Sequence, residues 1–121
     1  MRQVRNVMIK DFLVSNRSVQ FRSSGDSLYP VVQSGDVTLW EPITDHSKLV
    51  VHDIVFCVVQ PSGIFYGHMI HYIGTWTDGT TFWNIGNIDG RINGWCAAEH
   101  IFGRCMQCSN IKPAHVSEAT A

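Results

Sequence analysis

The chain has 121 residues, which is enough for one domain and too few for two ordinary ones. Hydrophobic residues make up 45% of the chain, so we expect a folded globular protein rather than a disordered one. Nine basic residues against ten acidic ones give a formal net charge of −1, which argues against nucleic acid and anionic membranes as partners.

The sequence carries no evident targeting or membrane segment. No apolar run approaches the roughly 18 residues that a membrane-spanning helix needs. Lys10 and Asp11 interrupt the N-terminal stretch, so we expect no secretory signal peptide. We therefore expect a cytoplasmic protein with reduced cysteines. The four cysteines are Cys57, Cys96, Cys105 and Cys108.

Strand signals dominate the sequence, whereas helix signals are weak. Runs of β-branched and aromatic residues alternate with Gly, Asp, Asn and Pro, which is typical of short strands joined by turns. The first eleven residues give no clear signal. The expected strands cover residues 12–14, 18–22, 37–40, 52–60, 64–73, 81–85 and 101–106.

The strongest strand signal lies at residues 52–60. Its centre, residues 54–59, is continuously apolar, as in a strand that is buried on both faces. A Pro-Ser-Gly turn follows, so residues 54–73 predict a hairpin. Residues 86–94 hold three Gly and two Asn and predict an irregular loop, and residues 95–100 predict a short helical turn.

Short strands at this regular spacing predict a mainly β fold, a small β-rich sandwich or partly open barrel with little helix. We divide the chain into three parts. Residues 1–20 form an N-terminal arm, residues 21–106 form the β domain, and residues 107–121 form a polar C-terminal tail.

The most informative motif is Gly25-Asp26-Ser27-Leu28, followed by Pro30. Glycine before a serine lets the backbone pass close to a substrate carbonyl, and proline after it fixes φ. A serine presented in this way acts as a nucleophile only if a general base reaches its Oγ. The same four letters match the GDSL esterases, but those enzymes resemble a larger α/β fold with an Asp-x-x-His pair that this chain lacks.

The chain resembles the LexA-type and signal-peptidase-type serine peptidases over residues 21–105. The first sequence box of that superfamily is similar to Gly-x-Ser-Met-x-Pro, followed by Gly-Asp and a strand. Here Ser27 and Pro30 occupy the matching positions, and Leu28 stands where the family has Met. Residues 35–36 are the Gly-Asp pair.

The later boxes of the family follow in order. The second has Gly-Asp or Gly-Glu where this chain has His52-Asp53. The third holds the general base. Because the chain has His68 and no Lys between residues 49 and 111, it is similar to the endoplasmic-reticulum and archaeal signal-peptidase branch, whose base is His. The later boxes resemble residues 50–56, 67–70, 85–90 and 100–104.

The resemblance implies acyl transfer by a Ser27–His68 dyad. His68 would accept the proton of Ser27 and later give it to the leaving amine. An unperturbed imidazole has a pKa of about 6.5, which suits a base at neutral pH. The backbone N–H groups of Asp26 and Ser27 would form the oxyanion hole. Asp89 could orient His68, although the family's acidic residue falls a few positions later, where this chain has Ile and Asn.

Plainer interpretations of the same residues stay open. A serine after Gly-Asp is commonly a turn residue, and His68 could be an ordinary strand histidine. His71 is the alternative base, although strand alternation places it on the face opposite His68. For Asp36 and Asp53 the sequence favours turn capping over chemistry.

The cysteine and tryptophan patterns suggest two further kinds of site. Cys3His is an accepted zinc ligand set, but a strand from residue 100 to residue 105 would spread these ligands. Thiols outside a metal site are therefore the preferred interpretation, and no metal or cofactor is assigned. The tryptophans lack interleaved basic residues, so we expect core and surface anchors rather than a base-stacking platform. The zinc candidates are Cys96, His100, Cys105 and Cys108, and the tryptophans are Trp40, Trp76, Trp83 and Trp95.

Two functions fit this sequence. The first is a serine endopeptidase-like domain that hydrolyses peptide bonds through Ser27 and His68. The second is a catalytically silent structural protein on the same fold, such as a viral capsid decoration or tail component, which would place it in a virion. Retention of both residues favours the peptidase, and the lack of a DNA-binding or membrane segment favours the assembly. The expected partners are a peptide or neighbouring subunits in a homo-oligomer or larger assembly, without nucleic acid or membrane.

Overall fold

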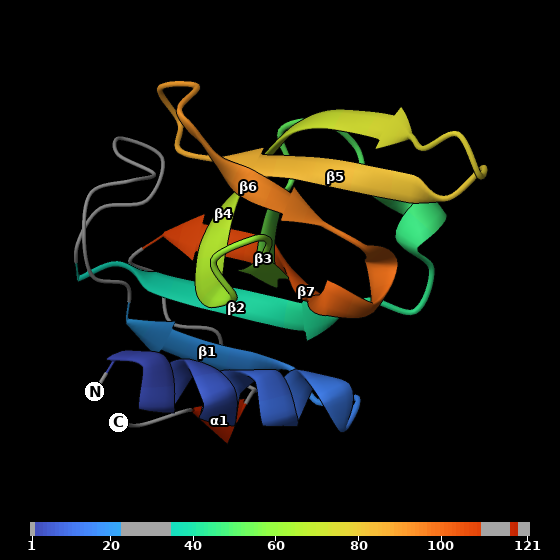
Figure 1. The fold of residues 1–121 in the computed structure, drawn as a ribbon. Helices are drawn as coiled ribbons and strands as arrows, with labels where there is room; N and C mark the ends of the chain where they lie inside the picture. Colours follow the sequence, from blue (N-terminus) through green and yellow to red (C-terminus); the bar gives the residue numbers. More distant parts are fainter. Residues whose placement is uncertain (1, 23–34, 110–116, 119–121) are drawn as a thin grey trace.

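The computed structural model describes residues 2–22, 35–109 and 117–118 (Figure 1). The structure is mainly β, as the sequence predicts. The elements in chain order are α1 (Arg2–Val14), β1 (Val19–Arg22), β2 (Val37–Pro42), η1 (His46–Lys48), β3 (Ile54–Val59), β4 (Ile64–Thr75), β5 (Thr81–Gly86), β6 (Ile92–Cys96), η2 (Ala98–His100), β7 (Ile101–Ser109) and β8 (Ser117–Glu118).

The strands form one sheet in the order β6-β5-β4-β3-β7-β2-β1-β8. Every neighbouring pair that involves β1 to β7 alone is antiparallel, and β8 joins β1 in parallel. The sheet curls into a half-barrel, and α1 lies along its β1 side (Figure 1). Among the described residues, no helix has the length and apolar character needed to cross a lipid bilayer.

Backbone hydrogen bonds close the curl where β6 returns to the end of β3. Gln60 donates its N–H to the carbonyl of Trp95 at 2.8 Å, and the N–H of Trp95 returns to the carbonyl of Gln60 at 3.1 Å. Gly94 makes this approach possible, because a Cβ on it would lie 2.0 Å from the carbonyl oxygen of Gln60. The sequence therefore places glycine where two backbones meet.

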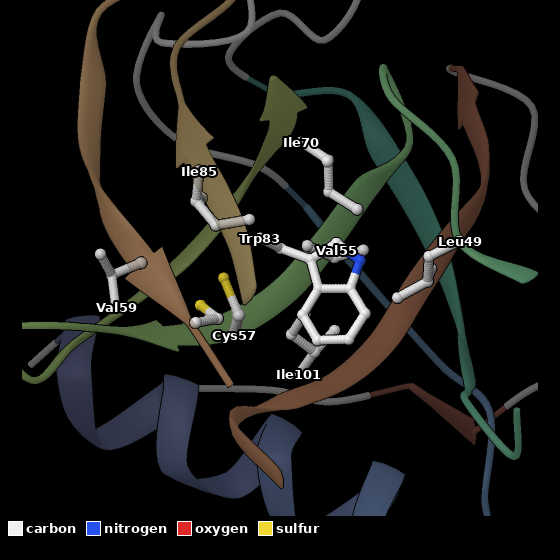
Figure 2. Close-up of a cluster of buried hydrophobic side chains, with 9 residues drawn as sticks. Leu49, Val55, Cys57, Val59, Ile70, Trp83, Ile85 and Ile101 are labelled. Carbon is white, nitrogen blue, oxygen red and sulfur yellow. The ribbon is translucent and has the colours of Figure 1, made fainter. Parts of the chain in front are cut away.

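Two clusters of buried side chains lie on opposite faces of β3. Alternation along β3 sends Ile54 and Phe56 to one face and Val55, Cys57 and Val59 to the other, which confirms that this apolar strand is buried on both faces. We call the first the helix-side cluster and the second the barrel cluster (Figure 2). The helix-side cluster comprises Ile9, Leu13, Val19, Phe21, Trp40, Ile54 and Phe56, and the barrel cluster comprises Leu49, Val55, Cys57, Val59, Ile70, Trp83, Ile85, Cys96 and Ile101.

The prediction of a strand at residues 12–14 is wrong, because these residues form the last turn of α1. Ile9 and Leu13 recur at the four-residue spacing of one helical face, and both are buried in the helix-side cluster. Burying each of them contributes about 2 kcal/mol, which outweighs the weak local preference of the segment for extended structure. The N-terminal arm thus contributes directly to the core.

The predicted loop at residues 86–94 is wrong in its second half, because β6 begins at Ile92. The helical turn expected at residues 95–100 is confined to η2, since β6 continues through Cys96. Local composition hides this strand, because its asparagine and glycine residues are typical of turns. Pairing with β5 and closure against Gln60 determine its conformation instead.

Replacing Gly94 with Ala should disrupt the seam between β6 and β3, by which we mean the paired backbone hydrogen bonds of Gln60 and Trp95. The added methyl group would overlap the Gln60 carbonyl and a Val59 methyl, so the backbones must separate. We expect a loss of about 3 kcal/mol in the free energy of unfolding, measured by urea denaturation. Thr77→Ala in an exposed turn is the matched control and should change stability by less than about 0.5 kcal/mol. A Gly94→Ala protein as stable as the control would contradict this account of the seam.

Candidate functional site

The candidate site is centred on His68 in the middle of β4. His68 pairs with Val55 of β3, so its side chain lies on the barrel-cluster side of the sheet. Only 8% of the residue is exposed. The neighbouring Gly67 leaves room on the opposite face for the Trp40 ring, since a Cβ there would lie 3.0 Å from it. His68 is therefore held in a strand that is packed on both faces.

The environment of His68 favours the neutral imidazole. Burial lowers the pKa of His68 below its usual value of 6.5. Hydrogen bonds with the Gly67 backbone and the Asn87 side chain offset part of this shift. A neutral imidazole can accept a proton, which is the state that a general base needs at neutral pH.

Asn87 is the residue that the sequence reasoning missed. Met69 pairs with Gly86 and Ile70 with Ile85, so one further step along this antiparallel register brings Asn87 opposite His68. The Asn87 side chain lies close enough to the imidazole to raise the pKa of His68. The strand register is the signal that could have found it, because a β4–β5 hairpin fixes both positions at once. An amide can orient an imidazole, as in the Cys-His-Asn arrangement of papain-like proteases.

Asp89, the orienting residue that the sequence suggests, lies in the exposed turn between β5 and β6. Its carboxylate Oδ1 accepts the N–H of Arg91 at 3.0 Å. This hydrogen bond is a local turn contact two residues along the chain. Among these two residues, Asn87 is the one whose side chain influences the pKa of His68.

His71 lies at an irregularity of β4. The β4–β5 register shifts between Ile70 and Tyr72, so β4 carries one extra residue at this point. The His71 imidazole Nε2 hydrogen-bonds the backbone carbonyl of Asn87. Both histidines therefore lie beside Asn87. The side chain of Asn87 faces His68, and the backbone carbonyl of Asn87 contacts His71.

Ser27 and Asp26, the expected nucleophile and part of the expected oxyanion hole, lie outside the described residues. The strands on either side of that segment, β1 and β2, are joined by hydrogen bonds through the Thr38 side chain. The Trp40 indole donates to Thr38 Oγ1 at 2.8 Å, and Thr38 Oγ1 donates to the Phe21 carbonyl at 3.2 Å. This chain of bonds joins β1 to β2 just before the segment begins.

Arg104 extends the polar row that begins at His68. From its position on β7, Arg104 pairs with Val55 on β3 and with Glu41 on β2, so these residues share the face of His68. Its guanidinium lies 3.7 Å from the Asp53 carboxylate, which also accepts the Val50 N–H at 3.0 Å. The expected structural role of Asp53 at a turn fits these contacts. An open pocket of about 210 Å³ lies beside the row and is lined by Glu41, Pro42, Ile43, Thr44, Asp45, Lys48, Leu49, Arg104 and Met106.

The proposed zinc ligands do not come together in the described part of the chain. Cys96 is buried in the barrel cluster, where its thiol donates to the Val58 carbonyl at 3.1 Å. Burial raises the pKa of the neighbouring Cys57 thiol, so a thiolate is disfavoured there. Cys105 is disulfide-bonded, so the expectation of a reduced thiol is wrong for this residue. No group of three potential ligands occurs among the described residues.

Comparisons with family models, curated proteins and solved structures find no match to this chain.

The pKa of His68 has a consequence for stability. The unfolded chain binds a proton on His68 more tightly than the folded protein does, so acid stabilises the unfolded state. The free energy of unfolding should therefore fall as the pH drops through 6.5. Urea denaturation of wild type and His68→Gln between about pH 7.5 and about pH 5 measures this, and the wild type should lose more stability on acidification. Parallel profiles would contradict the proposed burial effect.

Substitutions of Asn87 should move the pKa of His68 in opposite directions. Asn87→Ala removes an amide that favours the imidazolium and should lower the pKa of His68. Asn87→Asp places a negative charge beside the ring and should raise it. NMR titration of the imidazole signals measures both. Asp89→Asn is the control and should leave the His68 signal unchanged; a shift in this variant alone would make Asp89 the orienting residue.

Proposed function

We propose that this chain is a serine peptidase-like domain of the LexA and signal-peptidase type, in which Ser27 is the nucleophile and His68 is its general base. The observation that carries the proposal is the buried imidazole of His68 on a central strand, in surroundings that favour its neutral form. An imidazole in this state needs only a hydroxyl within reach to form a nucleophile–base pair.

Backbone conformation at two positions supports the resemblance. Gly35 adopts a φ of +93° directly before Asp36 and β2. His52 adopts a φ of +81° directly before Asp53 and β3, at the position where the resembled family has glycine. Positive φ is the conformation that glycine adopts without cost. Both Gly-Asp boxes of the family therefore correspond to left-handed turns that enter a strand.

The length of chain between β1 and Ser27 is compatible with this pairing. The Phe21 ring lies 6.4 Å from the Phe56 ring, and Phe56 is next to Val55, the strand partner of His68. Ser27 lies five positions after Arg22, and an extended chain of five residues reaches about 17 Å. We infer that this length allows Ser27 to approach His68, which lies on the face of the sheet opposite Phe21 and Phe56.

The proposed reaction is hydrolysis through an acyl-enzyme. Ser27 Oγ attacks the carbonyl carbon of a peptide while its proton moves to His68, and the carbonyl oxygen becomes an oxyanion. The backbone N–H groups of Asp26 and Ser27 would stabilise that oxyanion. The imidazolium then protonates the leaving amine as the C–N bond breaks. Water hydrolyses the resulting ester, with His68 again accepting the proton.

A fluorophosphonate probe should label the wild-type protein at Ser27. Ser27→Ala should abolish labelling, and His68→Gln should slow it by about 1,000-fold, because the hydroxyl loses its base. The labelling rate should rise with pH and level off above a pKa that lies below 6.5, since burial lowers the pKa of His68. Peptide mapping by mass spectrometry and a pH series of rates measure these outcomes.

The controls separate the peptidase from the silent assembly protein. Ser62→Ala, in the exposed turn after β3, is the matched serine control and should leave labelling unchanged. Folded wild-type protein that reacts no faster than Ser27→Ala would overturn the proposed peptidase. In that case mass measurement in solution decides whether the chain forms the expected oligomer or larger assembly.

A further inference from the structure

Four aromatic side chains gather on the outer face of β4, β5 and β6. Trp83 and Ile85 of β5 point into the barrel cluster. Because side chains alternate along a strand, Phe82 and Asn84 face outward. Tyr72 on β4 and Trp95 on β6 both pair with Asn84 and share its face. This face is the reverse of the one that carries His68.

The rings of this group contact one another. Trp76, at the end of the β4–β5 hairpin, stacks on Phe82 with centroids 4.2 Å apart and planes 27° from parallel. Trp95 meets Trp76 edge to face at 5.6 Å, and Tyr72 lies 6.0 Å from Phe82. We call Tyr72, Trp76, Phe82 and Trp95 the aromatic platform. Tyr72 is 55% exposed and Trp76 is 45% exposed, so two of its rings remain largely open to solvent.

Gly74 allows the rings to lie flat on the sheet. It pairs with Phe82, and a Cβ at this position would lie 2.5 Å from the Phe82 ring and 2.7 Å from the Tyr72 ring. Any larger residue would lift these rings from the backbone. The platform is therefore held in place before any ligand arrives, which reduces the entropy that binding must overcome.

The polar group at the centre of the platform is the neutral amide of Asn84. Asn84 lies between Tyr72 and Trp95 and provides an amide with two donors and an acceptor. From Ile64 to Cys96 the sequence contains one Lys or Arg residue, Arg91, which lies in the turn before β6. The Asp78 carboxylate is engaged by the N–H and hydroxyl of Thr80. Apart from Arg91, the described residues of β4, β5 and β6 therefore provide no Lys or Arg side chain for an anionic ligand.

We propose that the aromatic platform binds a neutral carbohydrate. The apolar C–H faces of a sugar ring stack on Trp76 and Tyr72, and its hydroxyls both donate to and accept from the Asn84 amide. A purely apolar partner would bury that amide without hydrogen bonds, which is unfavourable. A few polar groups set among aromatic rings are the usual composition of a small-molecule site.

Titration with cellohexaose, laminarihexaose and maltohexaose tests this proposal by tryptophan fluorescence. We expect a saturable change with at least one of the three sugars. Trp76→Ala and Tyr72→Ala should each weaken binding about tenfold, because each removes one stacking face. Asn84→Ala should weaken it by a similar factor through the lost hydrogen bonds. Circular dichroism tests whether each variant is folded. If Trp76→Ala does not fold, Tyr72→Ser is measured in its place.

One matched control lies on α1, away from the platform, and the other lies in the hairpin turn beside Trp76. Met8→Ala removes an exposed apolar side chain from α1, and Thr77→Ala removes an exposed hydroxyl from the hairpin turn; both should bind like wild type. No saturable response to any of the three sugars would overturn the proposal, as would unchanged binding by Trp76→Ala. Binding of decaproline instead of sugar, or a dimer that Trp76→Ala dissociates, would assign the platform to a different partner and overturn it equally.

Discussion

Gln60 and Trp95 exchange two backbone hydrogen bonds where β6 returns to the end of β3. Without this contact, β3, β4, β5 and β6 would form an open sheet and the barrel cluster would face solvent on one side. The same closure fixes the β5–β6 turn, because both strands that flank it are then paired. Asn87 begins that turn. Its contact with His68 therefore depends on the hydrogen bonds between Gln60 and Trp95 at the opposite edge of β6.

The two faces of the hairpin β4–β5 have different chemistry because the strand pleat separates their side chains. One face carries His68 among buried aliphatic residues, where a low dielectric favours an uncharged ring. The other carries the aromatic platform, where large apolar surfaces remain in water. Our two proposals thus use opposite sides of the same strands, and they can succeed or fail independently.

Composition and local pattern predicted the β class, the continuous buried strand at β3 and the hairpin that follows it. They failed at α1, because the packing of Ile9 and Leu13 against the sheet decides a conformation that eleven weakly helical residues leave open. They failed at β6 because seam closure imposes a strand on turn-forming residues. Both failures are cases in which tertiary contacts override local preference.

Local sequence pattern likewise pointed to one residue of the candidate site and missed another. His68 was found from its sequence context, since a histidine after glycine on an apolar strand resembles the family's base. Asn87 was missed because its position opposite His68 follows from the β4–β5 register, which local sequence patterns alone do not reveal. The side on which Tyr72 emerges also escaped prediction, because one extra residue at His71 shifts the alternation of β4.

That extra residue limits how β4 can change during evolution. Losing it would turn every side chain from Tyr72 to the end of the strand through half a turn, bringing a tyrosine into the interior and expelling Ile73 or its neighbours. Divergent sequences should therefore vary this hairpin arm in steps of two residues, or else compensate a single insertion with a second one nearby.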